Sequence, residues 1–456
     1  MNPWAIYTPN AADPWDRKKA GHLFRRAGFG ATASELSRAV ADGPEDTISR
    51  LLKGGKPDAD FEATSKFMAT LTSLPDSSPG IRLAAWWLYR ILHNPHPLRE
   101  KLALFWHNHF ATSVAKVLKA RLMKAQYDLL YAHALGDFRK LLREITVDPA
   151  MLVWLDAKDS KKGRPNENYA RELMELFSLG IGNYTEADIR EAAKAFTGYD
   201  VKGDNHTFDP KQHDDGIKKV LGKSGKFKAD DIVNICLAQA ACPKFIARKL
   251  YRFLVSETAE PTAELIVPLA AQYRESGFNT EKLVETILRS RHFFSNAAYR
   301  QRVKAPVEFA VGIVRGLDGN VGPMGLAEAL EPLGQMLFAP PSVKGWDGGP
   351  TWLNAQTLLF RQNLALTLTS GAESDCDPAK LLAKHGKSTD AEVVDFLLDV
   401  FLQGDVPAAA RRKLLAYCAD ARKAKYPTYW SDADATRHRL RTVAHLTLTL
   451  PEFQLD

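Results

Sequence analysis

Cysteine and long apolar runs are both scarce in this chain of 456 residues, and each scarcity excludes a class of protein. The four cysteines show no Cys-x-x-Cys spacing, which argues against a zinc ribbon or a thioredoxin-type site. No run approaches the roughly 20 apolar residues that cross a bilayer, and the N-terminal segment lacks the pattern of a signal peptide. The sequence therefore predicts a soluble, cytoplasmic protein with no membrane span.

A large excess of one charge is also missing. Lys and Arg total 61 against 54 Asp and Glu, and the formal net charge is only +7. A nucleic-acid-binding protein usually concentrates its basic residues in one stripe, whereas the two signs are interspersed here. Nucleic acid is therefore not favoured as a partner. Hydrophobic residues at 45% and charged residues at 25% are typical of a folded globular protein.

Strand signals are scarce, and helix signals dominate. Thr32-Ala-Ser-Glu35 forms a capping box that predicts a helix start, and Pro97 stands where helices accept proline, at the first position. The helix after Pro97 is expected to reach Leu130 with an interruption near Thr112. Other helices are predicted at 81–93, 136–147, 166–180, 186–197, 229–256, 261–276, 280–291, 305–317, 325–336, 390–403, 406–424 and 434–449.

The predicted fold is all-α, mainly an irregular multi-helix bundle, with a minor β-hairpin near 205–221 that turns at Asp215-Gly216. Loops rich in proline and glycine at 338–350 and 370–388 are the expected boundaries. We therefore predict a main helical domain over 1–370 that carries the polar site and a C-terminal helical subdomain over 371–456.

The common catalytic motifs are absent. The sequence has no His-Glu-x-x-His pair, no Glu-x-x-His pair of the di-iron bundles, no phosphate-binding P-loop, no dinucleotide fingerprint and no Gly-x-Ser-x-Gly elbow. Trp106-His-Asn-His109 superficially resembles an HNH nuclease, but that site needs a strand-hairpin-helix context and this segment is predicted to be helical. A site must therefore be sought in clusters of polar residues.

The first cluster is the histidine pair in Leu104-Phe-Trp-His-Asn-His-Phe110. Successive helix residues turn by about 100°, so His107 and His109 point in different directions. His109 follows the apolar stripe of Leu102 and Phe105, which sends at least one imidazole into the interior. A buried imidazole needs a polar partner, so a satisfied core histidine and a ligand or acid–base role both stay open.

The second cluster lies in Asn166-Glu-Asn-Tyr-Ala-Arg-Glu-Leu-Met-Glu-Leu-Phe177. Asn168, Glu172 and Glu175 share one ridge at helical spacing and border an apolar face. A carboxylate taken from water needs a cation, a metal or several donors, or it takes up a proton. This ridge is either a salt-bridge network that organises helices or a set of ligands or acid–base groups.

The third cluster is the polar segment with His206, His213 and Asp214. If the three clusters meet in space, His107, His109, Glu172 and His213 are the expected ligands of a divalent metal ion such as zinc, manganese or iron. The expected catalytic residues are then Glu175 or Glu167 as acid and base, and Arg171 as an anion clamp. Trp346 and Trp352, on a loop rich in glycine and proline, either stack on a ligand or cap the core.

Several of these segments together resemble a known family. They are Arg25-Arg-Ala-Gly-Phe-Gly30, Phe105-Trp-His-Asn-His-Phe110, Asp148-Pro-Ala-Met, Asn166-Glu-Asn-Tyr-Ala-Arg-Glu, Gly182-Asn-Tyr-Thr-Glu, His213-Asp-x-Gly216, Val303-Lys-x-Pro-Val-Glu308 and Val343-Lys-Gly-Trp346. In this order they resemble the signature blocks of the bacterial domain-of-unknown-function family number eighteen hundred, from about residue 20 onward.

The resemblance implies no settled activity. It implies that the blocks holding the polar residues above are characteristic of the family. It also implies a functional link to an exported, phosphatase- or sulfatase-like protein often encoded beside members, which leaves a periplasmic or envelope-associated location open. Three functions are weighed: a metal-dependent hydrolytic or oxidative enzyme, a non-catalytic binding or scaffold protein with a buried polar network, and a metal-free carbohydrate-active hydrolase. Whether the chain is an enzyme, and which substrate or protein partner it binds, stays open.

Overall fold

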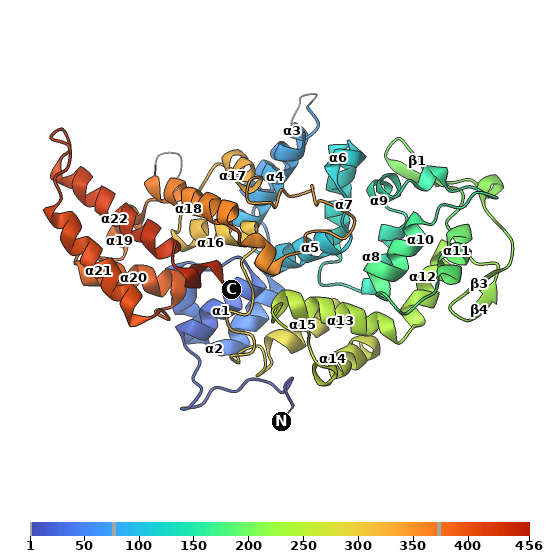
Figure 1. Ribbon diagram of the computed structural model, residues 1–456, viewed down its shortest axis with the longest axis horizontal. Coiled ribbons are helices and arrows are strands. Elements are labelled where there is room, and N and C mark those ends of the chain that lie inside the picture. Colours follow the sequence, from blue (N-terminus) through green and yellow to red (C-terminus); the bar gives the residue numbers. More distant parts are fainter. Residues whose placement is uncertain (1, 75–78, 372–374) are drawn as a thin grey trace.

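The predicted helical fold is confirmed by the computed structural model, which describes residues 2–74, 79–371 and 375–456 (Figure 1). None of the helices in these residues is both long and apolar enough to cross a membrane. The first third of the chain forms α1 Arg17–Ala27, α2 Ala33–Lys53, α3 Ala59–Leu71, α4 Pro79–His93, α5 Pro97–His109, α6 Val114–Val117, α7 Ala120–Ala132, α8 Phe138–Thr146 and α9 Pro149–Trp154.

The middle of the chain contains the strands and one π-helical segment. Its elements are α10 Asn168–Glu172, the π-helix η2 Leu173–Ser178, α11 Glu186–Ala195, β1 Tyr199–Lys202, β2 Asn205–Phe208, β3 Lys218–Val220, β4 Lys223–Gly225, α12 Ala229–Ala238, α13 Ala241–Leu254, α14 Ala263–Glu275 and α15 Thr280–Leu288. The last third forms α16 Pro306–Gly316, α17 Pro323–Leu330, α18 Ala355–Ser370, α19 Pro378–Lys384, α20 Asp390–Leu402, α21 Ala408–Lys423 and α22 Asp432–Leu448.

Local signals set several helix ends as predicted. The capping box is formed, because the Thr32 hydroxyl accepts from Glu35 N and the Glu35 carboxylate accepts from Thr32 N. Pro97 is the first residue of α5, and the predicted interruption lies between α5 and α6. The backbone leaves the helix after His109, and Val114 N, at the start of α6, donates to Phe338 O at 2.9 Å.

The hairpin prediction needs correction. Two short hairpins form, β1 with β2 and β3 with β4, and they turn at 203–204 and 221–222 rather than at Asp215-Gly216. Leu221 and Gly222 both have positive φ, as a type I′ hairpin turn requires. The segment around Asp215 instead curls around the buried ammonium of Lys218, which donates to Asp214 O and Gly216 O.

Helix α5 lies between two large apolar clusters and is buried on almost every side. Leu102, Phe105 and Trp106 belong to the cluster that α8 and α11–α15 complete, whereas Ala103 and Leu104 belong to the cluster of α4, α7 and α16–α22. A helix with apolar neighbours all round is typical of a protein interior. The polar side chains Glu100, Lys101, His107 and His109 of α5 are therefore buried, whereas Arg99 and Asn108 are partly exposed.

The C-terminal helices α19–α22 lie at one end of the molecule and the hairpins at the opposite end (Figure 1). Helix α22 packs on α18, and one apolar cluster joins Leu364 and Leu368 of α18 to Val443 and Leu448 of α22. The proposed division of the chain near residue 370 stays a prediction.

Candidate functional site

The main candidate site is a cleft of about 900 Å³ between α5, the π-helix η2, α13 and the loop that carries Trp346 and Trp352. Its lining joins parts of the chain that are far apart in sequence, from Leu104 to Trp352. Polar, charged and aromatic side chains all face this space. Such a mixture is typical of small-molecule sites, in which apolar walls carry a few placed polar groups.

His109 and Lys249 form a fixed pair at the cleft. His109 Nε2 lies 3.0 Å from Phe177 O, and its Nδ1 lies 3.0 Å from Lys249 Nζ. A carbonyl oxygen can only accept, so Nε2 carries the proton and Nδ1 accepts a hydrogen bond from the Lys249 ammonium. Lys249 Nζ also donates to Leu176 O at 3.3 Å. These contacts therefore fix the tautomer of the His109 imidazole and the position of the Lys249 amine.

The π-helix supplies the two carbonyls in this arrangement. Leu176 and Phe177 lie near its C-terminal end, where backbone carbonyls lack partners inside the helix. Single π-helical turns occur frequently at functional sites. In this π-helical turn, Phe177 O accepts from His109 of α5 and Leu176 O accepts from Lys249 of α13.

Burial shifts the protonation of both members of the pair. Burial, with Lys344 as a smaller contribution, lowers the pKa of Lys249 to about 8. Burial and the Lys249 ammonium together hold the pKa of His109 well below its usual range, although the bond to Phe177 O opposes the shift. At neutral pH the lysine therefore carries the proton and the imidazole is neutral.

One edge of the cleft is a row of cations on α13. Lys244, Arg248, Lys249 and Arg252 all line it, and the i, i+4, i+8 spacing puts Lys244, Arg248 and Arg252 on one helix face. Within the described residues no acidic side chain pairs with Lys244 or Arg248 at salt-bridge distance, whereas Arg252 pairs with Glu260. Two exposed cations without acidic partners favour an anionic ligand at this edge.

Another wall is the tryptophan loop, which Asn108 holds in place. Trp346 N donates to Asn108 Oδ1 at 2.7 Å, and Asn108 Nδ2 donates to Trp346 O at 3.3 Å. Trp346 and Trp352 are only 6% and 7% exposed. The two indoles therefore form a wall that is mostly packed against protein, closer to the core-capping alternative than to an open stacking platform.

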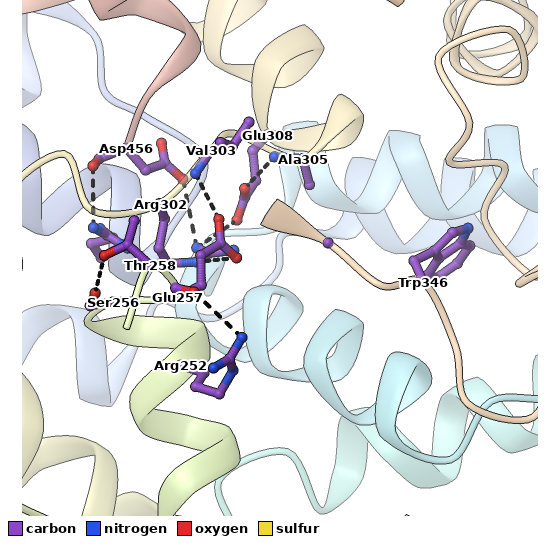
Figure 2. A network of polar contacts seen from close by, with 12 residues as sticks. Arg252, Ser256, Glu257, Thr258, Arg302, Val303, Ala305, Glu308, Trp346 and Asp456 are labelled. Atoms are coloured by element: carbon purple, nitrogen blue, oxygen red, sulfur yellow. Dashed lines mark hydrogen bonds and ion pairs between the residues drawn. The ribbon is translucent and has the colours of Figure 1, made fainter. Parts of the chain in front are cut away.

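A dense network of ion pairs forms another side of the cleft (Figure 2). Arg302 lies among three carboxylates, at 3.7 Å from Glu257, 3.4 Å from Glu308 and 3.7 Å from Asp456. Glu257 Oε1 accepts from Val303 N, and Glu308 Oε2 accepts from Ala305 N, each at 2.7 Å. Arg302 and Glu308 are almost fully buried, so this network fixes the shape of the site.

The cleft brings together two of the residues predicted from the sequence, His109 and Glu175. Glu175 accepts from the Tyr184 hydroxyl at 2.8 Å. Its helical neighbour Glu172 is half-buried, and burial together with the Glu175 charge raises the pKa of Glu172 to about 7. Glu172 was predicted as a metal ligand, and the acid–base roles predicted for Glu175 and Glu167 stay predictions.

The other predicted residues lie elsewhere. Arg171 pairs with Glu186 at 2.8 Å and with Glu167 at 3.3 Å, which makes them a surface ion-pair group. His107 is buried edge-on against Trp87 and also contacts Trp346 from behind the cleft wall. His213 Nδ1 lies 3.0 Å from Thr197 O, beside the hairpins.

The four expected metal ligands therefore do not form one cluster. Across residues 2–74, 79–371 and 375–456, no group of three or more His, Cys, Asp or Glu side chains is placed to hold a metal ion. His109 in addition uses both ring nitrogens in hydrogen bonds. Metal binding stays a prediction that no ligand geometry in these residues supports.

Lys249, Glu257 and Glu308 are site residues that sequence reasoning missed. The signal for Lys249 was present, because four basic residues of α13 fall at nearly helical spacing from Lys244 to Arg252. Glu308 lies in the block Val303-Lys-x-Pro-Val-Glu308, but nothing in a single sequence reveals that its carboxylate is buried.

The fold and the site define a mainly helical protein with a cationic, aromatic-walled cleft. The chain belongs to the family described as protein of unknown function (DUF1800), whose model matches residues 22–455. This confirms the resemblance seen in the sequence blocks. Comparisons with curated proteins and with solved structures find no match.

Proposed function

We propose that this chain is an enzyme that binds a small anionic molecule in the cleft and transfers protons to and from it at Lys249. The observation that carries the proposal is the 3.0 Å contact between Lys249 Nζ and His109 Nδ1 in that cleft. Small-molecule sites usually enclose about 300–1,000 Å³, and the cleft volume of about 900 Å³ falls in this range.

Lys249 is suited to proton transfer because its pKa is lowered to about 8. An acid–base group works best when its pKa is close to the working pH, whereas an ordinary lysine, with a pKa of about 10.4, stays protonated at neutral pH. Lys249 donates a proton below about pH 8 and accepts one above it. His109 stays neutral and orients the amine.

Lys244 and Arg248 support the choice of an anionic ligand. Both are exposed at the cleft edge, and neither is matched to an acidic side chain of the described residues at salt-bridge distance. Clefts lined by one sign of charge attract ligands of the opposite sign. Aromatic rings of Phe245 and Phe253 beside these cations provide contact for an apolar part of the ligand.

Calorimetric titration with sugar phosphates, aromatic carboxylates and nucleotides tests binding. At least one class should bind, and the Lys244→Gln/Arg248→Gln variant should weaken it about tenfold, because hydrogen bonds to charged groups are lost. The matched control is Lys380→Gln/Lys384→Gln, which removes the same charge outside the cleft and should bind normally. Equal loss in both variants, or no binding by any anion, would contradict the proposal.

Deuterium exchange then tests proton transfer. Compounds that bind are incubated with the protein in D₂O, and NMR follows the C–H signals next to their carbonyl or carboxylate groups. Lys249→Met should abolish the exchange while binding persists, because the cations at the edge remain. Binding without exchange for every compound would instead favour the non-catalytic binding protein weighed from the sequence.

A further inference from the structure

We infer that Lys249 forms an imine with the carbonyl carbon of an anionic aldehyde or ketone bound in the cleft. This inference rests on the proposed function, since it uses the same cleft and the same lysine. It goes further by naming the substrate class and a covalent intermediate.

The surroundings of the Lys249 amine favour a nucleophile over a structural cation. Its Nζ contacts two neutral acceptors, His109 Nδ1 at 3.0 Å and Leu176 O at 3.3 Å. Among the described residues no carboxylate lies within salt-bridge distance of it, and the Phe245 ring centroid is 5.1 Å away. Desolvation and a neighbouring cation are two of the ways in which a lysine is activated as an imine-forming nucleophile.

A comparison with Lys101 and Lys304, two of the buried lysines, shows what distinguishes Lys249. Lys101 is fully buried and pairs directly with the Glu308 carboxylate, so its charge is neutralised where it stands. Lys304 donates to Phe453 O at 2.7 Å and, like Lys249, lies against a ring. The cavity beside Lys304, however, has a volume of only about 30 Å³, which is too small for an organic ligand. Of these three lysines, Lys249 is the one that faces a ligand-sized space.

The covalent step balances without any further reactant. The Lys249 ammonium first gives up its proton to solvent water in the cleft while His109 stays neutral, and the free amine attacks the carbonyl carbon to form a C–N bond. The carbonyl oxygen takes one proton from the attacking nitrogen and one from solvent water, and the C–O bond then breaks to release water. An ammonium and a carbonyl thus become a protonated imine and one water, with no change of oxidation state.

Borohydride trapping tests the inference. Pyridoxal 5′-phosphate serves as the probe, because it joins an aldehyde to a flat ring and a phosphate. The protein is incubated with it and reduced with sodium borohydride, and peptide mass spectrometry locates the modified lysines. We expect Lys249 to be labelled at least about tenfold more than exposed Lys244 of the same helix, because a charged contact orients the phosphate.

Three comparisons make the result specific. Pyridoxal, which lacks the phosphate, should label Lys249 about tenfold less than pyridoxal 5′-phosphate does. Pyridoxal 5′-phosphate should likewise label Lys249 about tenfold less in the Lys244→Gln/Arg248→Gln variant than in the parent protein. Lys249→Arg should remove the main label while the circular dichroism stays helical, and Lys304 should stay unlabelled. Equal labelling of Lys249 and Lys244, or no preference for the phosphate, would overturn the inference.

The two proposals fail in different ways. If anions bind and Lys249→Met abolishes exchange but no imine is trapped, the imine inference is refuted and the proton-transfer function is retained. If no anion binds in the cleft, both the proposed function and the imine inference are refuted.

Discussion

Replacing Glu308 by glutamine is expected to lower the free energy of unfolding by about 3 kcal/mol. Glu308 is 3% exposed and Lys101 is fully buried, and they form a direct ion pair. Arg302 Nη1 lies 3.4 Å from the same Glu308 oxygen. Burial raises the pKa of Glu308, but Arg302 and Lys101 together outweigh it and hold that pKa well below the usual range. The folded protein therefore needs this carboxylate in its charged form.

The magnitude follows from what the substitution leaves behind. Removing one member of a buried pair typically costs about 3–5 kcal/mol, because the other charge stays buried without compensation. Arg302 keeps Glu257 and Asp456 at 3.7 Å each, which places the expected loss at the lower end. Glutamine keeps an oxygen to accept from Ala305 N, whereas Glu308→Ala also loses this helix cap and should cost about 1 kcal/mol more.

Urea unfolding at neutral pH, followed by far-ultraviolet circular dichroism, measures these differences. Asp347→Asn is the control, because its pair with Lys344 is exposed and should change stability by less than about 1 kcal/mol. The double variant Lys101→Met/Glu308→Leu should recover most of the loss, since apolar residues of similar size can replace a buried ion pair. A Glu308→Gln variant within about 1 kcal/mol of the parent would refute this account of the network.

Two further predictions concern the neighbourhood of the cleft. The pKa of Glu172 is about 7 in the folded protein, which is above its value of about 4.5 in the unfolded chain. Its charged form therefore lowers the free energy of unfolding above about pH 7. This loss of stability disappears below about pH 4.5, where the carboxyl is protonated in both states. Glu172→Gln should therefore stabilise the protein in urea at about pH 8 and not at about pH 4; equal effects at both would contradict the shift. Gly345 has a φ of +86°, and an added Cβ would lie 2.5 Å from Asn108 O, whereas Gly222 has a φ of +77° with nothing within 4 Å. Gly345→Ala should lower stability more than Gly222→Ala and shift tryptophan emission, and equal losses would show that the Asn108 contact does not matter.

Much of the helical pattern was predictable because its signals are local. The capping boxes at Thr32 and Thr185 and the proline at position 97 act within one turn of the chain, so their effects do not depend on distant residues. The hairpin turns were harder to predict. Asp215-Gly216 is a favourable turn pair, but the buried Lys218 ammonium gathers that segment around itself.

For the site, the sequence by itself determined that His107 and His109 diverge, that Glu172 and Glu175 share a ridge, and that the chain belongs to its family. These statements follow from helical periodicity and from short blocks. Only the tertiary structure decided which groups meet. Helix α5 lies between two apolar clusters, so His109 reaches Lys249, 140 residues further along the chain, while His107 packs behind the tryptophan wall. Periodicity fixes the direction of a side chain about its own helix, but the packing of separate helices places its partner, and that packing depends on the whole core.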